Sequence, residues 1–241
     1  MAEKCRICNR NLNFIFYGNI FNNNILYYEC PQCLYVQTQK PYWLEQAYSE
    51  AIHTKDTGIF VRNYLCCKKT TNLCWLLGIK NKKILDYAGG YGIFVRLMRD
   101  IGFQIFWEDR YCDNLFAKKF VGKDGKYELI TAFEVFEHFD KPVEELTKIL
   151  NKSDQIFFST KLIPDPTPSL ENWDYYGLEH GQHIGFFRGK TLEYLALKFN
   201  KYLYSYGDFH FFSSTKISKI NFLLIMKFYN FFFFFFAKKN M

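Results

Sequence analysis

Outside its C-terminal tail, the chain has almost no excess of either charge. The whole sequence carries 31 basic and 24 acidic residues, but five of the lysines and none of the acids lie from Ser213 onward. The rest of the chain is therefore nearly neutral and contains no basic stripe of the kind that binds nucleic acid. This balance argues against nucleic acid as a partner of the main domain.

The sequence also has no apolar leader and no cysteine pattern typical of disulfides. Met1 to Cys5 runs directly into a cysteine motif without an apolar segment, so we expect no secretory signal. Four of its eight cysteines form two CxxC pairs. Such pairs suit a reducing compartment and metal binding better than disulfide bonds. The sequence thus predicts a cytoplasmic protein.

No uninterrupted apolar run is long enough for a clear membrane span. The longest candidate, residues 220–236, is marginal in length and is interrupted by Lys227 near its middle. We interpret residues 213–241, which contain a run of six phenylalanines, as a low-complexity tail that packs loosely or is disordered. The alternative, which we do not favour, is a lysine-flanked amphipathic anchor that contacts a membrane surface.

Apolar residues make up 49% of the 241 residues and aromatic residues 21%, which predicts one folded core with a small appendage. Strand and helix patterns alternate, which predicts a mainly parallel sheet with helices on both faces. These segments are 83–86, 91–101, 104–108, 112–120, 128–132, 142–150 and 155–159. A closing pair of strands, 202–206 and 208–212, would complete a seven-stranded sheet.

The first cysteine pair, Cys5 and Cys8, is separated by 21 residues from the second, Cys30 and Cys33. Two such pairs can place four thiolates tetrahedrally around Zn²⁺, and a four-cysteine site is structural because it leaves no open coordination position. The segment between them predicts two strands with a turn at residues 22–24, as in a zinc ribbon. The alternative is a set of reduced structural cysteines.

A strand over 83–86 runs through a turn of small residues into a helix. Asp86 ends the strand, and the turn contains Ala88, Gly89, Gly90 and Gly92. Free N–H groups at such a turn, together with the helix dipole, form a site for the polar part of a ligand. A glycine turn alone is a weak signal, since a tight turn can also bind nothing. Glu108 and Asp109 follow the next strand, where nucleotide-binding units place an acid on the ribose hydroxyls.

Three stretches together resemble the class I S-adenosylmethionine (SAM)-dependent methyltransferases: DYAGGYG, the acid after the second strand, and YELITAFEVFEHFDKP. The similar branch has Glu-His after the fourth strand and is often found with an N-terminal cysteine-rich zinc module. The match covers roughly residues 82–212 and implies a Rossmann-like fold. Ala88 departs from the family pattern by replacing the first glycine of the turn, and we expect SAM binding to survive this change.

The resemblance assigns cofactor contacts to the turn and to the strand ends beside it. It places Asp86 near the methionine ammonium group and Asp109 on the ribose hydroxyls, with Glu108 as the alternative. The other predicted contacts are Ala88, Gly89, Gly90, Gly92, Phe133 and Glu134. Some relatives methylate sugars, so the resemblance also implies a small, sugar-like acceptor.

Four residues are candidates for acid–base chemistry at the acceptor: Glu137, His138, His180 and His183. The first two follow the fourth strand, and the two later histidines lie in an insertion, residues 161–188, that contains three prolines, Trp173, Tyr175 and Tyr176. A histidine there can act as a base, and the aromatic rings can stack on a sugar. The alternatives are a helix cap for Glu137 and His138 and a structural loop for the insertion. A metal site at the two later histidines would lack a completing carboxylate.

We therefore predict four parts: a zinc ribbon over 1–40, a linker and helices over 41–80, a SAM-dependent methyltransferase domain over 81–212 and the tail over 213–241. Within the second part, Gly58–Leu77 predicts an amphipathic helix whose cysteines are small core residues. The alternative functions are a catalytically inactive methyltransferase-like zinc-ribbon binding protein and a methyltransferase that acts on nucleic acid or protein.

Overall fold

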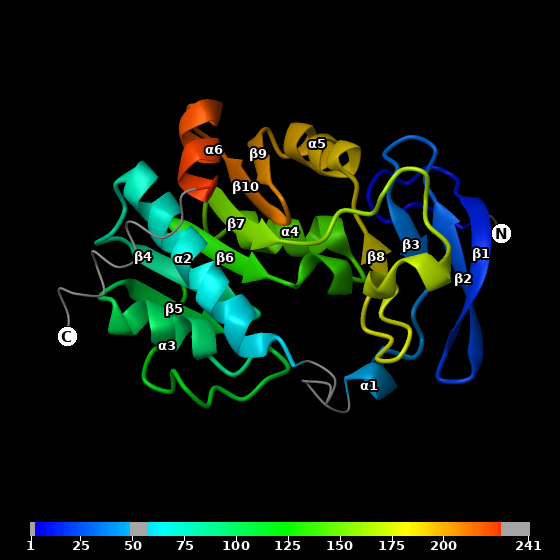
Figure 1. The fold of residues 1–241 in the computed structure, drawn as a ribbon, viewed down its shortest axis with the longest axis horizontal. Helices are drawn as coiled ribbons and strands as arrows, with labels where there is room; N and C mark the ends of the chain where they lie inside the picture. Colours follow the sequence, from blue (N-terminus) through cyan, green and yellow to red (C-terminus); the bar gives the residue numbers. More distant parts are fainter. Residues whose placement is uncertain (1–2, 49–56, 228–241) are drawn as a thin grey trace.

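The structure is a computed structural model that describes residues 3–48 and 57–227. Its strands form two sheets, one of six strands and one of four. Figure 1 shows the six-stranded sheet with its helices on one side of the molecule and the four-stranded sheet at the N-terminal end on the other. The predicted mixed α/β class with a mainly parallel main sheet is confirmed.

The main sheet has the strand order β5-β4-β6-β7-β10-β9. The first four strands are parallel, and β10 runs antiparallel to both of its neighbours. Its strands are β4 (Lys83–Tyr87), β5 (Gln104–Glu108), β6 (Leu129–Phe133), β7 (Gln155–Ser159), β9 (Tyr202–Tyr206) and β10 (Phe209–Ser213). The chain leaves β4 toward β5 on one side and later returns as β6 on the other. Strand order therefore reverses between β4 and β6, which is where such sheets bind ligands.

Helices cover both faces of this sheet, as Figure 1 shows. One face packs against α2 (Ile59–Leu77), α3 (Ile93–Asp100) and α6 (Lys219–Lys227), and the other against α4 (Pro142–Leu150) and α5 (Gly189–Lys198). Alternate residues of β7 belong to the two cores, with Phe157 on the first face and Phe158 on the second. This alternation is the two-residue period of a strand that is buried on both sides.

Two expectations for the main sheet are corrected. The described residues contain six of the seven expected strands, and residues 112–120 form turns instead of a helix. Asp109 accepts hydrogen bonds from two backbone N–H groups after it, and the Asn114 side chain bonds both backbone groups of Ala117. Such local side-chain bonds compete with helix formation. An isolated parallel bridge from Val121 to Trp107 lies where an additional strand would extend the sheet beyond β5.

The second sheet has the order β1-β2-β3-β8. Its strands are β1 (Asn13–Ile20), β2 (Asn23–Glu29), β3 (Val36–Thr38) and β8 (Gly185–Phe186). The two residues between β1 and β2, Phe21 and Asn22, both have positive φ, as a two-residue hairpin turn requires. The turn thus begins one residue before the predicted position. Because β8 comes from the insertion after β7, the N-terminal ribbon and the insertion share one sheet.

Helix α2 has the predicted position, and its expected apolar side, which also includes Leu65, Leu73, Leu76 and Leu77, faces the core except near the N-terminal end of the helix. Cys66, Cys67 and Cys74 are buried as expected, whereas Phe60 and Tyr64 are exposed. The buried side also includes Lys69 and Asn72, which donate hydrogen bonds to the backbone carbonyls of Met226 and Ile225. Polar side chains are tolerated on this face because α6 offers them acceptors.

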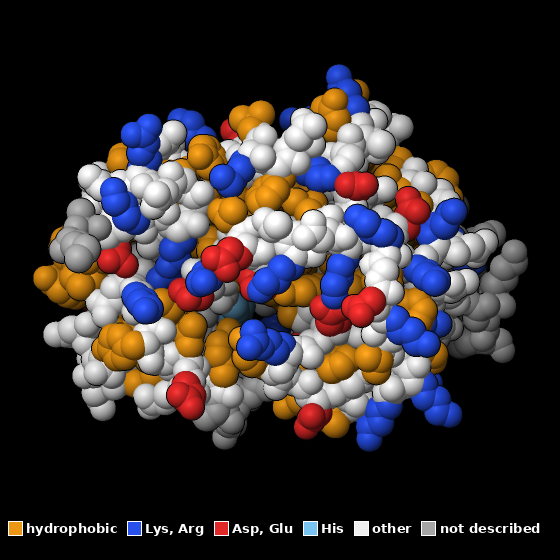
Figure 2. Space-filling view, turned by 180° about the vertical axis from the view of Figure 1, so that it is seen from behind, with side chains coloured by type: hydrophobic (Ala, Val, Ile, Leu, Met, Phe, Trp, Pro, Cys, Tyr) orange, Lys and Arg blue, Asp and Glu red, His pale blue; other side chains and the backbone are white. Residues whose placement is uncertain are grey.

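Part of the C-terminal segment is a packed helix rather than a loose extension. In α6, Phe222 and Met226 are fully buried against α2 and the main sheet. The phenylalanine run of the tail lies outside the described residues. Over the described residues, the structure contains no helix that is both long and apolar enough to cross a membrane. On the face seen in Figure 2, basic and acidic side chains are interspersed.

Candidate functional site

The turn after β4 lies at the carboxyl edge of the sheet, and steric limits explain why its residues are small. Ala88, Gly90 and Gly92 all adopt positive φ, at 55°, 53° and 83°. A Cβ on Gly89 would lie 2.6 Å from Asp86 Oδ2, whereas a Cβ on Gly90 would meet no atom within 4 Å. The turn thus packs tightly on the protein at Gly89 and is open at Gly90, which leaves room for a ligand.

Of the two acids after the second strand, Asp109 lies at the turn. Gly90 N–H donates a 2.8 Å hydrogen bond to Asp109 Oδ2, and the Trp107 indole N–H donates to the carbonyl of Gly90. Glu108 instead accepts a 2.7 Å hydrogen bond from Lys152 Nζ and forms an ion pair with it. The geometry therefore brings Asp109 to the glycine turn, while the Glu108 carboxylate is paired with a lysine.

Buried carboxyl groups gather at the carboxyl ends of β4 and β6. Asp86 is almost fully buried, and burial raises its pKa to about 8 although the Thr131 hydroxyl donates a hydrogen bond to it. Burial and the neighbouring charge of Glu137 raise the pKa of Glu134 to about 7. A cation placed among these groups would favour their ionised forms, so the site suits a positively charged ligand.

Phe133 and Glu134, the remaining predicted cofactor contacts, lie where β6 ends. The Phe133 ring packs edge-on against Phe94 and Phe157 in the core. Glu134 has a φ of 53° and accepts a 2.6 Å hydrogen bond from the Ser159 hydroxyl. A non-glycine residue in this conformation is held by its surroundings, and such strain is concentrated at functional sites.

Three of the four predicted acid–base residues meet beyond the end of β6. Glu137 and His138 belong to the short helix η1 (Phe136–His138), and His183 immediately precedes Ile184 and β8. One ligand atom from each of the three lies within 4.8 Å of the others. Burial lowers the pKa of His138 well below its usual value and that of His183 to about 4, so both rings are neutral near pH 7.

His180, the fourth candidate, lies beside this cluster but outside it. Its ring centre is 4.7 Å from that of His183, and its Nδ1 accepts a hydrogen bond from the backbone N–H of Gln182. Of the two histidines in residues 179–183 (EHGQH), His183 thus belongs to the cluster and His180 lies next to it.

Two tyrosines hold the cluster and connect it to the glycine turn. The hydroxyl of Tyr48 lies 2.9 Å from His138 Nδ1, and its ring stacks on Tyr111, whose N–H donates to Asp109. The Tyr175 hydroxyl donates a 2.8 Å hydrogen bond to Glu137. The sequence marks Tyr48 only as an aromatic residue before a helix, so its partnership with His138, 90 residues later, becomes visible only in the fold.

A cavity of about 190 Å³ is lined in part by Tyr175, whose hydroxyl donates to Glu137 of this cluster. Six of its nine lining residues are charged or polar: Arg62, Glu134, Ser159, Lys161, Tyr175 and Asp208. The other two aromatic residues predicted to face an acceptor, Trp173 and Tyr176, are buried instead in the core shared with the ribbon. They pack there because the insertion has to cover the apolar face of β2 and β8.

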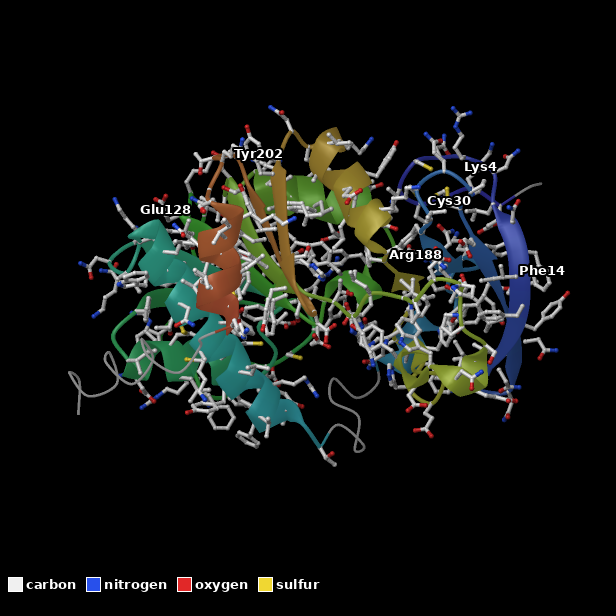
Figure 3. All side chains as sticks on the ribbon, turned by 45° about the horizontal axis from the view of Figure 1, so that its top comes forward. Lys4, Phe14, Cys30, Glu128, Arg188 and Tyr202 are labelled. Carbon is white, nitrogen blue, oxygen red and sulfur yellow. The ribbon has the colours of Figure 1, made fainter. Side chains whose placement is uncertain are left out.

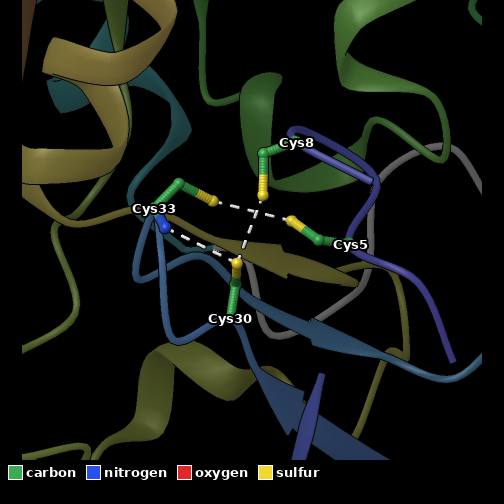
Figure 4. Close-up of side chains that lie close together, drawn as sticks. All are labelled: Cys5, Cys8, Cys30 and Cys33. Atoms are coloured by element: carbon green, nitrogen blue, oxygen red, sulfur yellow. Dashed lines mark hydrogen bonds between the residues drawn. The ribbon is translucent and has the colours of Figure 1, made fainter. Parts of the chain in front are cut away.

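The four N-terminal cysteines form a separate cluster, shown in Figure 4, with their sulfur atoms directed toward one another. Cys5 and Cys33 have their Sγ atoms 3.6 Å apart, and Cys8 and Cys30 have theirs 3.3 Å apart. Tetrahedral zinc with bonds of about 2.3 Å would space the sulfurs by about 3.8 Å. The sites therefore fit a zinc ion with only a small expansion.

The two halves of the cysteine cluster have the same local structure. Asn9 N–H donates to the carbonyl of Cys5, and Leu34 N–H donates to that of Cys30. Asn9 and Leu34 both have positive φ. Each CxxC pair is thus closed by a turn of five residues, which directs both sulfurs of the pair to one side.

Two arginines connect the ribbon to the insertion. The buried Arg188 donates hydrogen bonds to Glu29 in β2 and to Thr167 in the insertion. Figure 3 shows Arg188 between the ribbon and α5, whereas Phe14 points outward from β1. Arg6 donates to the carbonyl of Ile184, whose own N–H donates to the carbonyl of Glu137. The ribbon is thereby bonded to the residue after His183, and that residue is bonded in turn to the backbone of Glu137.

Comparison with known proteins bears on the main sheet and its surroundings. A family model described as a methyltransferase domain matches residues 60–205, which is more than half of the chain. No curated protein sequence matches.

Among solved structures, one similar chain is the magnesium protoporphyrin IX methyltransferase of Synechocystis PCC 6803 with bound S-adenosylhomocysteine (SAH), at 11% identity and a TM-score of 0.47, covering 70% of this chain and 90% of that one. Another is the plantazolicin methyltransferase with a pentazolic substrate analogue and SAH, at 14% identity and a TM-score of 0.49, covering 81% and 85%. A third is monomeric WbdD, at 17% identity and a TM-score of 0.44, covering 74% and 45%.

Proposed function

Because the chain belongs to the family of methyltransferase domains, we propose that it transfers a methyl group from SAM to a hydroxyl group of a small, sugar-like acceptor. One observation carries this proposal. The glycine turn, Asp109 and the buried carboxyl groups lie at the point where strand order reverses, beside the Glu137–His138–His183 cluster. Such sheets bind ligands at this point.

The residues at the turn fit the chemical groups of SAM. We assign the methionine end, whose ammonium and sulfonium are positive, to the side of Asp86 and Glu134, which are buried carboxyl groups. Asp109 accepts three backbone hydrogen bonds and keeps one lone-pair direction for a ribose hydroxyl. The main chain at Ala88, Gly89, Gly90 and Gly92, together with Phe133, forms the remaining wall.

When bound, SAM supplies a methyl group already activated by its sulfonium, so the work of the chain is to position the acceptor and exclude water. We assign the acceptor to the 190 Å³ cavity, because charged and polar side chains lie among its lining residues and can form hydrogen bonds with a small neutral molecule that has several hydroxyl groups. Tyr175 offers an aromatic face there. We assign activation of the attacked hydroxyl to Glu137, His138 and His183 rather than to His180, which lies outside the cluster.

We further propose that Cys5, Cys8, Cys30 and Cys33 hold a structural Zn²⁺ ion. The sulfur spacing and the paired CxxC turns support a tetrahedral four-thiolate site. Thiolate ligands of this kind also suit a reducing compartment, and a cytoplasmic location stays a prediction. The four-part division of the chain stays a prediction as well.

Calorimetric titration with SAH tests the cofactor site. We expect the wild type to bind, and Gly90→Val to bind at least about tenfold more weakly because its side chain enters the open space before the turn. Gly78→Val is the matched control, since Gly78 also has positive φ and open space but lies at the end of α2. Asp109→Ala should weaken binding in the same way, and Glu108→Gln should not. Equal losses in Gly90→Val and Gly78→Val would contradict the assignment.

A turnover assay separates this function from a binding protein that has lost its activity. SAH formation from SAM, measured with nucleotide sugars, free sugars, protein and RNA, should rise only with an acceptor of the sugar class. SAH binding without turnover on any acceptor would support the inactive methyltransferase-like alternative.

A further inference from the structure

Glu137, His138 and His183 form a set of ligands that the four-cysteine cluster does not use. Their ligand atoms lie within 4.8 Å of one another, and His138 Nε2 is 3.9 Å from Glu137 Oε1. The rings of His138 and His183 are 4.9 Å apart between centres and nearly perpendicular. Two imidazoles and one carboxylate thus lie close together in the segments that follow β6 and precede β8.

Each of the three residues is oriented by a further hydrogen bond. Nδ1 of His183 lies 2.6 Å from the carbonyl of Tyr175, so it carries the proton and leaves Nε2 as a free acceptor. Nδ1 of His138 bonds the Tyr48 hydroxyl, which leaves its Nε2 on the side of Glu137. The Tyr175 hydroxyl donates to Glu137 Oε1. Metal-binding histidines and carboxylates in proteins are typically held by such outer contacts.

The second oxygen of Glu137 makes no well-formed hydrogen bond, although the Thr160 hydroxyl lies near this carboxylate and favours its ionised form. Glu137 is fully buried, and among the residues that the structure describes its Oε2 has no hydrogen-bond partner. An unsatisfied buried carboxylate oxygen is costly, whereas a bound cation would satisfy it.

We propose that Glu137, His138 and His183 bind a divalent first-row transition-metal ion, separate from the zinc held by the cysteines. Two imidazole nitrogens and one carboxylate oxygen suit such an ion, whereas Mg²⁺ and Ca²⁺ prefer oxygen ligands alone. Bonds of about 2.0–2.2 Å place neighbouring ligand atoms about 3–3.5 Å apart, so binding draws the three side chains together by about 1 Å.

A three-ligand ion keeps open coordination positions. Tyr175, which bonds the ligand Glu137, also lines the 190 Å³ cavity. This part of the inference rests on the proposed function: the open positions would take hydroxyl oxygens of the acceptor, and coordination would lower the pKa of the hydroxyl that receives the methyl group. The expected acceptors are therefore molecules with neighbouring hydroxyl groups, because two such oxygens can bind the same ion.

Cobalt titration of the full chain, with the ribbon first loaded with one equivalent of zinc, tests the site. We expect one further equivalent of Co²⁺ to bind, with weak visible d–d absorption and no intense thiolate charge-transfer band, because the second site contains nitrogen and oxygen only. Glu137→Gln and His183→Gln should each weaken this binding at least about tenfold. His180→Gln, which changes the neighbouring histidine outside the ligand set, should leave it within about twofold.

Absence of a second equivalent, a thiolate charge-transfer band or an equal loss in His180→Gln would overturn the proposal. Should the Glu137 or His183 variants fail to fold, paramagnetic Mn²⁺ added to the zinc-loaded wild type should broaden the NMR signals of the His138 and His183 imidazoles most strongly. Unbroadened signals from these two rings would overturn the proposal as well. SAH binding measured on the same samples distinguishes the proposed metal site from the proposed methyl transfer. Loss of the metal site leaves SAH binding intact. A failure to bind SAH leaves the cobalt result unaffected.

Discussion

Gly89 and Gly90 are neighbours in the turn after β4, but each is a glycine for a different reason. At Gly89 the protein itself leaves no space, because Asp86 and Trp107 lie where a side chain would be. At Gly90 the space is open and the hydrogen bond to Asp109 fixes the backbone. Ala88 has the same left-handed conformation as Gly90 at 55° but carries a Cβ. The departure from the family pattern thus adds backbone strain to the turn without filling the open side.

Replacing Ala88 by glycine should stabilise the protein slightly. A left-handed conformation costs alanine about 1–2 kcal/mol, and the extra freedom of glycine in the unfolded chain offsets about 0.5–1 kcal/mol of that gain. We expect urea denaturation to show about 0.5 kcal/mol of added stability, with SAH affinity within about twofold. In the reverse control, Gly78→Ala at φ 68° should destabilise by about 1 kcal/mol. A loss of stability in Ala88→Gly would contradict this account.

The raised pKa of Asp86, about 8, should make stability depend on pH. Between about pH 4 and pH 8 the folded protein keeps a proton on this carboxyl group that the unfolded chain releases, so the free energy of unfolding falls as pH rises. Asp86→Asn removes this contribution and still accepts the hydrogen bond from Thr131. Urea denaturation of the ligand-free proteins at pH 5, 6.5 and 8 measures the effect.

The expected result is a steeper fall for the wild type than for Asp86→Asn. Glu134 and Glu137, whose pKa values are also raised by burial, contribute the same downward slope to both proteins and cancel in the comparison. Parallel curves for the two proteins would show that Asp86 ionises freely in the folded state.

At the scale of elements, the two-residue strand β8 connects the ribbon to the part of the chain that contains the main sheet. It adds to β3 at the edge of the ribbon sheet and directly follows His183 and Ile184. Ile184 N–H bonds Glu137, and Arg6 of the ribbon bonds the carbonyl of Ile184. Residues 183–186 of the insertion thus carry one of the three clustered side chains, and this short segment is bonded to the ribbon on one side and to η1 on the other.

Arg188 should stabilise this junction far more than a surface ion pair would. Its buried guanidinium bonds Glu29, Thr167 and two backbone carbonyls, and Arg188→Met leaves these partners unpaired. We expect a loss of about 3 kcal/mol in chemical denaturation. Arg96→Met is the matched control, because the Arg96–Asp100 pair is exposed and should contribute less than about 0.5 kcal/mol. Similar losses in the two variants would mean that the junction does not depend on Arg188.

At the scale of the whole molecule, the ribbon and the main sheet share their cores. Cys5, Cys30 and Tyr35 belong to the same apolar cluster as Phe158 of β7 and Leu192 of α5. A second cluster joins the ribbon to Trp173 and Tyr176 of the insertion. The N-terminal module is therefore packed into the cores of the rest of the chain rather than being a separate attachment.

Removal of the proposed zinc ion should destabilise the entire chain. In a four-thiolate site the free energy of metal binding is folding free energy, and the shared cores transmit its loss to the main sheet. Calorimetry should show one unfolding transition for the zinc-loaded protein and a lower melting temperature after chelation. Cys30→Ser should reproduce this shift, whereas Cys112→Ser, outside the cluster, should not. Two transitions, of which the larger is unchanged by chelation, would contradict the shared core.

The sequence by itself determined the local elements and the family. Apolar runs with the strand or helix period fix β5, α4 and β7 at their predicted bounds, because these signals depend only on neighbouring residues. The two cysteines of each CxxC pair and the small residues of the turn after β4 are likewise separated by only a few residues, so the sequence alone identifies them. Segment 112–120 was predicted wrongly as a helix because side-chain bonds from Asp109 and Asn114 to the backbone outweigh its apolar pattern.

Only the tertiary structure decided which distant residues meet. Tyr48 reaches His138, Arg6 reaches Ile184, and β8 joins the ribbon sheet, all across more than 80 residues. Two-residue strands and single side-chain contacts leave no periodic pattern in a sequence, because the partner surface that stabilises them exists only after the chain has folded. For the same reason the sequence offered His180 and His183 alike, and the fold brought only His183 to Glu137 and His138.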